Sequence, residues 1–223
     1  MCAASNECAS PQACVVGRCQ DPNGVPLIQK KEVRRHLIAP VAMAYVQRGE
    51  PATDGAAAPV FTLGRAGVGD GRLYLRFAVP LAKETSILEA YVLLDRSFAS
   101  QPDPTPIVLH AARVIDPWEP RSISWSFQPR FEEARTPSTR VMPAPRHLVR
   151  IDVRAIVQRW AQRDPQDQGI VIMADNSTDV GMAFAMASTV GASLEDGSSL
   201  AQASSSSPPR LELYVAPEAA DRK

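Results

Sequence analysis

Short segments in which apolar and polar residues alternate recur along this chain, and turn-forming residues bound each of them. An alternation with a period of two places every second side chain on the same face, which predicts half-buried β-strands. The positions expected to face the interior are Leu73, Leu75, Phe77 and Val79; Leu88, Ala90, Val92 and Leu94; Ile123, Trp125 and Phe127; Met182, Phe184 and Met186; and Leu211, Leu213 and Val215.

Other segments predict strands or a helix from different patterns. Residues 169–175 are apolar on both faces, as expected of a central strand that is covered twice, and 107–114 and 148–153 add two further strands. After Asp152 the apolar residues change to a helical spacing, and Asp152 is a suitable N-cap for one short helix. The apolar stripe of that helix is Val153, Ile156, Val157 and Trp160.

These elements predict an all-β fold, an antiparallel two-sheet sandwich of the jelly-roll type with one short helix. Twenty prolines, twelve glycines and 6% aromatic residues describe many short segments rather than long helices, which argues against helix bundles. Parallel α/β folds are excluded because the helices they require are missing. An apolar content of 45% in 223 residues is enough for a sizeable core. We expect the sandwich to span 41–216, followed by a C-terminal tail at 217–223.

All the cysteines lie at the N-terminus, in the spacing C-x5-C-x5-C-x4-C. An even number in a short polar segment predicts disulfides, so 1–24 is expected to be a small cross-linked microdomain. Zinc is an alternative, but zinc ligands are usually two to four residues apart and no histidine lies nearby. A lipid-bearing first cysteine of a mature lipoprotein is a third interpretation, and it would leave an unpaired thiol. The cysteines are Cys2, Cys8, Cys14 and Cys19.

The segment "CASPQACVVGRC" resembles a short four-cysteine repeat of exported myxobacterial proteins, with Gln12, Val15 and Gly17 in matching places. This resemblance implies an oxidising compartment: the periplasm, the outer surface or the medium. No basic and apolar leader precedes the segment in this sequence. Four cysteines allow three pairings. The pairs we expect are Cys2 with Cys14 and Cys8 with Cys19.

Between the microdomain and the sandwich we predict a linker at 25–40, because the stretch begins with a turn signal and continues into a basic cluster. A solvated connector is the interpretation we favour, and a docking patch for an acidic partner is the alternative. The basic residues are Lys30, Lys31, Arg34 and Arg35.

The order of the strands and the helix, with Arg76 and Phe77, Trp118 and Trp125, "DVRAIVQRW" and "PRLELYV", resembles the DNRLRE domain family over about residues 41–216. That family is related to disaggregatase repeats and to alginate-type carbohydrate-binding modules. The resemblance implies a jelly roll on secreted or surface proteins that is usually non-catalytic. Because the binding residues of such modules vary, it implies no particular ligand.

Charge and motifs narrow the function further. Twenty-four basic side chains balance 24 acidic ones, so no field of one sign attracts nucleic acid. The longest apolar run, 37–46, is far shorter than a transmembrane segment, which needs roughly 20 residues. His36, His110 and His147 lack the spacing of metal ligands, and no G-x-S-x-G motif is present. We therefore predict no catalytic residues.

Two candidate binding sites remain. Asp175, Asn176 and Asp179 offer oxygen ligands for calcium, although a polar turn is the interpretation we favour, and no other cofactor is expected. Trp118 is the tryptophan most open to a role in stacking on a sugar, although a core position is the interpretation we favour. The serine-rich tract 192–207 predicts a loop that could order on a neighbouring subunit.

The function we predict is that of a non-catalytic, exported cell-surface module that binds polysaccharide or mediates adhesion. The alternative is a structural subunit of an extracellular or cell-envelope assembly, in which the partners are other surface proteins and the chain forms homo- or hetero-oligomers. A polysaccharide lyase or hydrolase is the third hypothesis. It requires an assembled acid, base and cation, and adjacent Glu132 and Glu133 would point to opposite sides of a strand.

Overall fold

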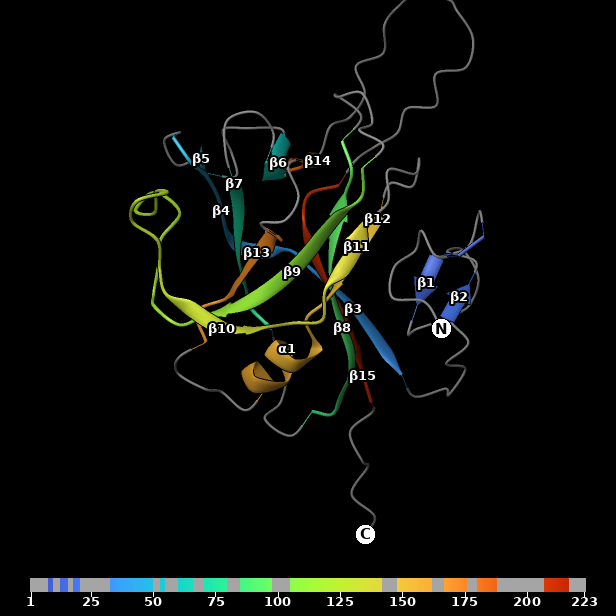
Figure 1. The fold of residues 1–223 in the computed structure, drawn as a ribbon. Helices are drawn as coiled ribbons and strands as arrows, with labels where there is room; N and C mark the ends of the chain where they lie inside the picture. The colour runs from blue at the N-terminus through green and yellow to red at the C-terminus, as the bar shows by residue number, and fades with distance from the viewer. Residues whose placement is uncertain are drawn as a thin grey trace, which may run out of the picture.

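The computed structural model contains two antiparallel sheets, a small N-terminal hairpin and one helix (Figure 1). Every pairing between the described strands is antiparallel. The predicted all-β sandwich with one short helix is therefore confirmed. The structure describes residues 8–9, 13–15, 18–20, 33–49, 53–54, 60–65, 70–79, 85–97, 105–141, 148–161, 167–175, 180–187 and 207–216.

The larger sheet has nine strands in the described part of the chain. They are β4 (Pro40–Gln47), β5 (Thr53–Asp54), β6 (Val60–Arg65), β7 (Asp70–Phe77), β9 (Ile107–Val114), β10 (Phe131–Arg135), β11 (Thr139–Val141), β13 (Ile170–Ala174) and β14 (Gly181–Ala185). The main path runs in the order β10, β9, β13, β7, β4 and β5. In addition, β11 pairs with β9, and β6 pairs with both β7 and β14.

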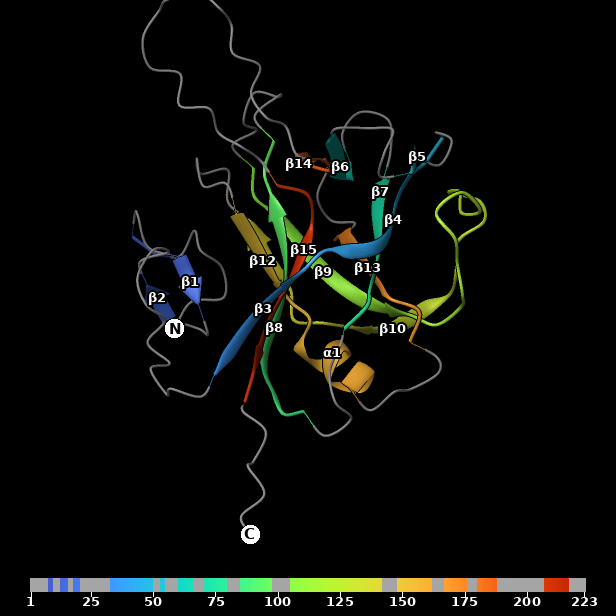
Figure 2. The ribbon, with the colours of Figure 1, turned by 180° about the vertical axis from the view of Figure 1, so that it is seen from behind.

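The smaller sheet has four described strands, paired in the order β12 (Leu148–Asp152), β8 (Ile87–Asp95), β15 (Arg210–Val215) and β3 (Arg34–Ile38). Strands that are neighbours in this sheet are far apart in the sequence, because the chain passes repeatedly between the two sheets, as it does in a jelly roll. In Figures 1 and 2 the strands β3, β8 and β15 run together on one side of the molecule, and β4, β7 and β13 on the other.

The main hydrophobic core lies between the sheets, because it combines Leu73 and Leu75 of β7 with Val92 of β8 and Leu213 of β15. The predicted inward faces of these strands are confirmed. Leu88 is only partly buried. Val79 is partly buried against the core as well, but it lies beyond the end of β7 at Phe77.

At the start of β8, Ile87 takes the buried position instead of the residue after it. The ladder between β15 and β8 shifts between Tyr214, which faces Glu89, and Val215, which faces Ile87. A shift in register changes which side chain points inward, and alternation alone does not reveal it.

Strand β13 pairs with β9 on one side and β7 on the other, so it is an interior strand of the larger sheet. Ile170 and Ile172 belong to the main core, whereas Val171 and Met173 belong to a second buried cluster on the opposite face. The prediction of a strand covered on both faces is confirmed.

The single described helix, α1 (Arg154–Ala161), begins as predicted. The Asp152 carboxylate accepts a hydrogen bond of 2.9 Å from the backbone N–H of Arg154, as an N-cap should. In the predicted apolar stripe, the residues buried in the core are Val153, Ile156 and Val157. Trp160 is partly buried and packs against this core. In the part of the chain that the structure describes, no helix is both long enough and apolar enough to cross a membrane.

The strand predicted at Ile123, Trp125 and Phe127 is wrong, because none of these residues lies in a strand and the latter two lie in a bend. The hydroxyl of Ser122 donates to the carbonyl of Glu119 at 2.9 Å, and Ser124 exchanges two backbone hydrogen bonds with Phe127. Serine side chains that bond to nearby backbone compete with strand pairing. The segment in which serine and aromatic residues alternate therefore forms a folded loop, because its serines bond to nearby backbone.

This loop, residues 115–130, covers the outer face of the larger sheet. Its Trp118 and Ile123 are buried in the second cluster together with Tyr74 of β7. The phenol of Tyr74 donates to Gln128 at 2.7 Å, which pins the far end of the loop to the sheet. The loop is thus a fixed cover.

At the N-terminus, β1 (Ala13–Val15) and β2 (Arg18–Gln20) form a two-stranded hairpin. Cys8 and Cys19 form a disulfide, with Cα atoms 5.3 Å apart, so this predicted pair is confirmed. Cys2 lies outside the described residues and only the backbone of Cys14 is described, so the second pair stays a prediction.

The linker predicted at 25–40 is wrong from Arg34 onward. Strand β3 pairs with β15 along its length, and Arg35 forms an ion pair with Glu212 at 2.7 Å. The sandwich therefore begins with β3 rather than at residue 41. Charged residues are common on the edge strand of a sheet, where they give no apolar alternation. Lys30 and Lys31, the other half of the basic cluster, lie outside the described residues.

Candidate functional site

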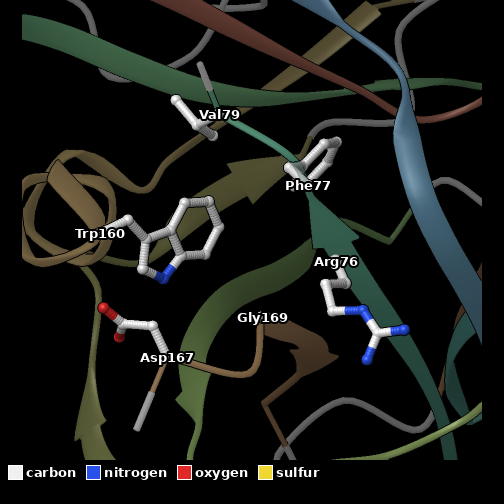
Figure 3. Close-up of a pocket in the computed structure, with 6 residues that line it drawn as sticks. All are labelled: Arg76, Phe77, Val79, Trp160, Asp167 and Gly169. Atoms are coloured by element: carbon white, nitrogen blue, oxygen red, sulfur yellow. The ribbon is translucent and has the colours of Figure 1, made fainter. Parts of the chain in front are cut away.

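A pocket of about 240 Å³ lies where the end of β7 meets α1 and the segment that leads into β13 (Figure 3). Its walls combine two aromatic rings with one cationic and one anionic side chain. A concave apolar site with a few converging polar groups is the usual form of a ligand site, so this pocket is our candidate. The residues that line it are Arg76, Phe77, Val79, Trp160, Asp167 and Gly169.

The aromatic walls are Phe77, the last residue of β7, and Trp160, in the last turn of α1. Their ring centroids are 6.4 Å apart and their planes are inclined by 39°. The indole N–H of Trp160 is buried and has no hydrogen-bond partner among the described residues. Leaving a buried donor unpaired costs about 1–3 kcal/mol, which favours a bound group that can accept this hydrogen bond.

The anionic wall is Asp167, whose side chain is 8% exposed and forms an ion pair of 2.5 Å with Arg113 of β9. Arg113, 5% exposed, also donates to Glu132 of β10 at 2.9 Å. Glu132 accepts a second bond, of 2.8 Å, from Arg159 of α1. This chain of alternating charges joins the larger sheet to the helix and fixes the carboxylate of Asp167.

The cationic wall is Arg76, on the outer face of β7. Its guanidinium donates to the backbone carbonyl of Trp118 at 3.0 Å and lies 5.4 Å from the centroid of that indole ring. Glu119 approaches it at 3.4 Å from the solvent side. These contacts anchor the cation to the covering loop, and Figure 3 shows the guanidinium turned away from Asp167.

Gly169 forms the floor, just before β13. Its φ of +118° is a conformation that residues with a Cβ rarely adopt. A Cβ at this position would also collide with the carbonyl oxygen of Leu75 in β7, while the Gly169 carbonyl accepts a bond of 2.9 Å from Val114 in β9. A glycine is therefore required for the chain to pass between these strands.

Trp118, the predicted sugar-stacking candidate, is 4% exposed and lies in the second buried cluster. Its indole N–H donates to the carbonyl of Gln168 at 2.7 Å, and its ring meets Tyr74 edge-on at 5.9 Å. The structure thus places it under the covering loop, where it contacts the back of Arg76 and presents no open face.

The calcium candidates are only partly described. Asp175 follows β13 and its backbone N–H donates to Val108 at 2.8 Å, whereas Asn176 and Asp179 lie outside the described residues. Over the described ranges, no three histidine, cysteine, aspartate or glutamate side chains are grouped so that they could hold a metal ion. Calcium at this loop stays a prediction.

The pocket was not predicted from the sequence. Arg76 and Phe77 carried the family resemblance and Trp160 was placed on the helix stripe, but none was assigned to a common site. Asp167 and Gly169 were not singled out at all. The one available signal is an acidic residue two positions before a glycine that opens a buried strand.

A second cluster of charges lies on the outer face of the smaller sheet. Glu212 of β15 is fully buried and accepts bonds from Arg150 at 2.9 Å, Arg35 at 2.8 Å and Tyr214 at 3.1 Å. Burial acts to raise the pKa of Glu212, but the two guanidinium groups outweigh it and hold the pKa below its ordinary value. Burial also raises the pKa of Tyr214 to about 12. We assign this cluster to stability.

Comparisons with family models and with curated proteins found no match to this chain. The resemblances to the DNRLRE family and to the four-cysteine repeat therefore stay predictions. What the chain does has to be argued from its own geometry.

Proposed function

We propose that this protein is a non-catalytic, exported surface module that binds polysaccharide in the pocket between β7, α1 and β13. The observation that carries the proposal is the buried indole N–H of Trp160, which has no partner among the described residues and lies in a pocket wall. Hydroxyl groups of a sugar accept such bonds, and inclined aromatic rings suit the apolar face of a sugar ring.

Two further features support the proposal. The Cys8–Cys19 disulfide is of the kind that persists in oxidising compartments, in agreement with export. Glycoside hydrolysis generally needs two carboxyl groups flanking the bond, whereas Asp167 is the single acidic residue among the described pocket-lining residues, and its carboxylate is already paired with Arg113. Binding is therefore the better use of this site.

The first prediction tests the indole N–H. We expect Trp160→Phe, which keeps an aromatic ring and removes the donor, to weaken polysaccharide binding about 3- to 10-fold, the value of one hydrogen bond. Affinity electrophoresis through gels that contain neutral and acidic polysaccharides measures the change. Trp125→Phe is the matched control, because Trp125 lies outside the pocket beside Arg48 and Arg72, and it should bind like the native protein. Native protein that is not retarded in any gel would rule the proposal out.

A structural subunit of a larger assembly is the second candidate, and Phe127 is the observation that favours it. This side chain is 73% exposed at the tip of the covering loop. The loop is held in place by a two-pronged bond between Arg130 and Asp116, at 3.0 and 2.8 Å, and by Gln128 on Tyr74. A rigid, exposed aromatic side chain is typical of an anchor in a protein interface.

The second prediction separates this candidate from a monomeric module. If Phe127 is an interface anchor, natively purified protein should have the mass of an assembly, and Phe127→Ser should shift it to the mass of a single chain. Native mass spectrometry measures both. Leu37→Ser is the control, because Leu37 is 48% exposed on β3 in the other sheet. Native protein that has the mass of one chain at all concentrations contradicts the assembly hypothesis.

A further inference from the structure

The polar groups of the pocket suit a particular class of sugar. Figure 3 shows the indole nitrogen of Trp160 on the side of its ring that faces Asp167. No direct hydrogen bond joins the two, because the indole N–H has no partner among the described residues. A donor and an acceptor that flank a gap are matched by a group that both accepts and donates. A hydroxyl does both, whereas a carboxylate only accepts and an ammonium only donates.

The charges around the pocket also favour an uncharged ligand. Asp167 lines the pocket, and its buried carboxylate is paired with Arg113, which is shared with Glu132. A carboxylate or sulfate on the ligand would meet the negative charge of Asp167 at the indole end. An ammonium group would meet Arg76 at the opposite wall. Like charges at such distances repel more strongly in a half-buried site than in water, so an uncharged ligand is favoured.

The size of the pocket limits how much of the ligand enters. The pocket volume of about 240 Å³ is the volume that roughly eight water molecules occupy in liquid water. The inclined rings of Phe77 and Trp160, with centroids 6.4 Å apart, form its apolar side. A single sugar ring at a chain end or a side branch fits these dimensions better than a run of linked rings.

From these observations we infer that the pocket selects a neutral sugar residue, one hydroxyl of which accepts from the indole N–H of Trp160 and donates to the carboxylate of Asp167. The inference rests on the proposed polysaccharide function and adds to it the class of ligand and the role of Asp167. It predicts that uronic acids and sulfated sugars are rejected.

The test uses the full chain with three probes: dextran and galactomannan, which are neutral, and polygalacturonate, which is acidic. We expect calorimetric titration to show binding of at least one neutral probe, little change of that affinity between 50 and 500 mM salt, and at least tenfold weaker binding of polygalacturonate. Asp167→Asn keeps the shape and removes the charge, and it should weaken neutral binding about tenfold and narrow the gap to the acidic probe. Asp116→Asn is the control, because Asp116 pairs with Arg130 outside the pocket, and it should bind like the native protein.

The outcomes separate the two ideas. Preference for polygalacturonate, or unchanged neutral binding in Asp167→Asn, overturns this inference and leaves polysaccharide binding intact. No binding of any probe by the native protein overturns the proposed function and the inference with it. If Asp167→Asn does not fold, Trp160→Phe decides instead, because it keeps the Asp167–Arg113 pair. It should lose affinity for the neutral probe and retain its weak binding of polygalacturonate.

Discussion

Replacing Glu212 with alanine is expected to lower the free energy of unfolding by about 3–5 kcal/mol, the cost of breaking a buried ion pair from one side. Glu212 is fully buried, and Arg150, whose side chain is 7% exposed, bonds to it at 2.9 Å. Without the carboxylate, the Arg150 guanidinium would remain buried and would lose this charged partner. Arg35, at 49% exposure, can turn to solvent and adds less.

Urea unfolding followed by tryptophan fluorescence measures this change. Glu119→Ala is the matched control, because Glu119 also pairs with an arginine but is 73% exposed, and an exposed pair contributes about 0–1 kcal/mol. If Glu212→Ala unfolds within about 1 kcal/mol of the native protein, the cluster on the smaller sheet contributes no more than such an exposed pair, and our assignment of it to stability is wrong.

The same residue makes stability depend on pH in acid. Burial raises the pKa of Glu212, but Arg150 and Arg35 together bring it below the ordinary value of 4.5. A carboxyl group with a lowered pKa in the folded state stabilises the fold fully above its unfolded-state pKa. That contribution is lost as the pH falls from 4.5 through the folded-state pKa. Glu212→Gln should therefore show a shallower loss of stability below pH 4.5 than the native protein.

Sequence alone predicted the parts of this fold in which one face is apolar and the other polar. The strands around Leu75, Val92 and Leu213, and the helix that follows Asp152, all have such a pattern, since each buries one face in a common core. Hydrophobic burial is the largest force in folding. A pattern that it imposes is therefore visible without the structure.

Elements held by polar contacts were not predicted correctly, because polar contacts impose no such apolar pattern on the sequence. The sequence of strand β3 resembles a basic linker, because it contains Arg35 and His36 and few apolar residues. The strand is held by its backbone hydrogen bonds to β15 and by the ion pair with Glu212. The segment around Trp125 resembles a strand because serines alternate with aromatic residues, although their hydroxyls bond to nearby backbone instead. In both cases hydrogen bonds decide the local structure, and the spacing of apolar residues does not reveal them.

The pocket could not be predicted because its walls come from three separate segments. Arg76 and Phe77 end one strand, Trp160 ends the helix, and Asp167 lies in a polar connection. Each residue alone has an ordinary explanation as a surface cation, a core ring or a loop acid. The antiparallel pairing of β13 with β9 and β7 is what brings them together.

Gly169→Ala is expected to lower the free energy of unfolding by about 2–5 kcal/mol, since two costs add. A left-handed backbone costs a residue with a Cβ about 1–2 kcal/mol, and Gly169 has a φ of +118°. Its Cβ would also meet the Leu75 carbonyl oxygen, which belongs to the ladder of β7 and can move only with the strand. Forcing extra atoms into a packed interior costs about 1–3 kcal/mol more.

Gly49→Ala separates the two costs, because Gly49 has a φ of +86° and a Cβ added there would have nothing within 4 Å of it. We expect this variant to lose only the backbone contribution, about 1–2 kcal/mol. Urea unfolding of both variants under the same conditions gives the difference, which measures how tightly β13 and β7 close beneath the pocket.

The two variants should also differ in binding. A Gly169→Ala protein that folds is expected to lose saccharide binding, since the floor moves relative to Trp160 and Asp167, whereas Gly49→Ala should keep it. Equal destabilisation of the two variants would show that the strands separate easily there. A floor that moves so readily could not hold the hydroxyl geometry proposed for the site.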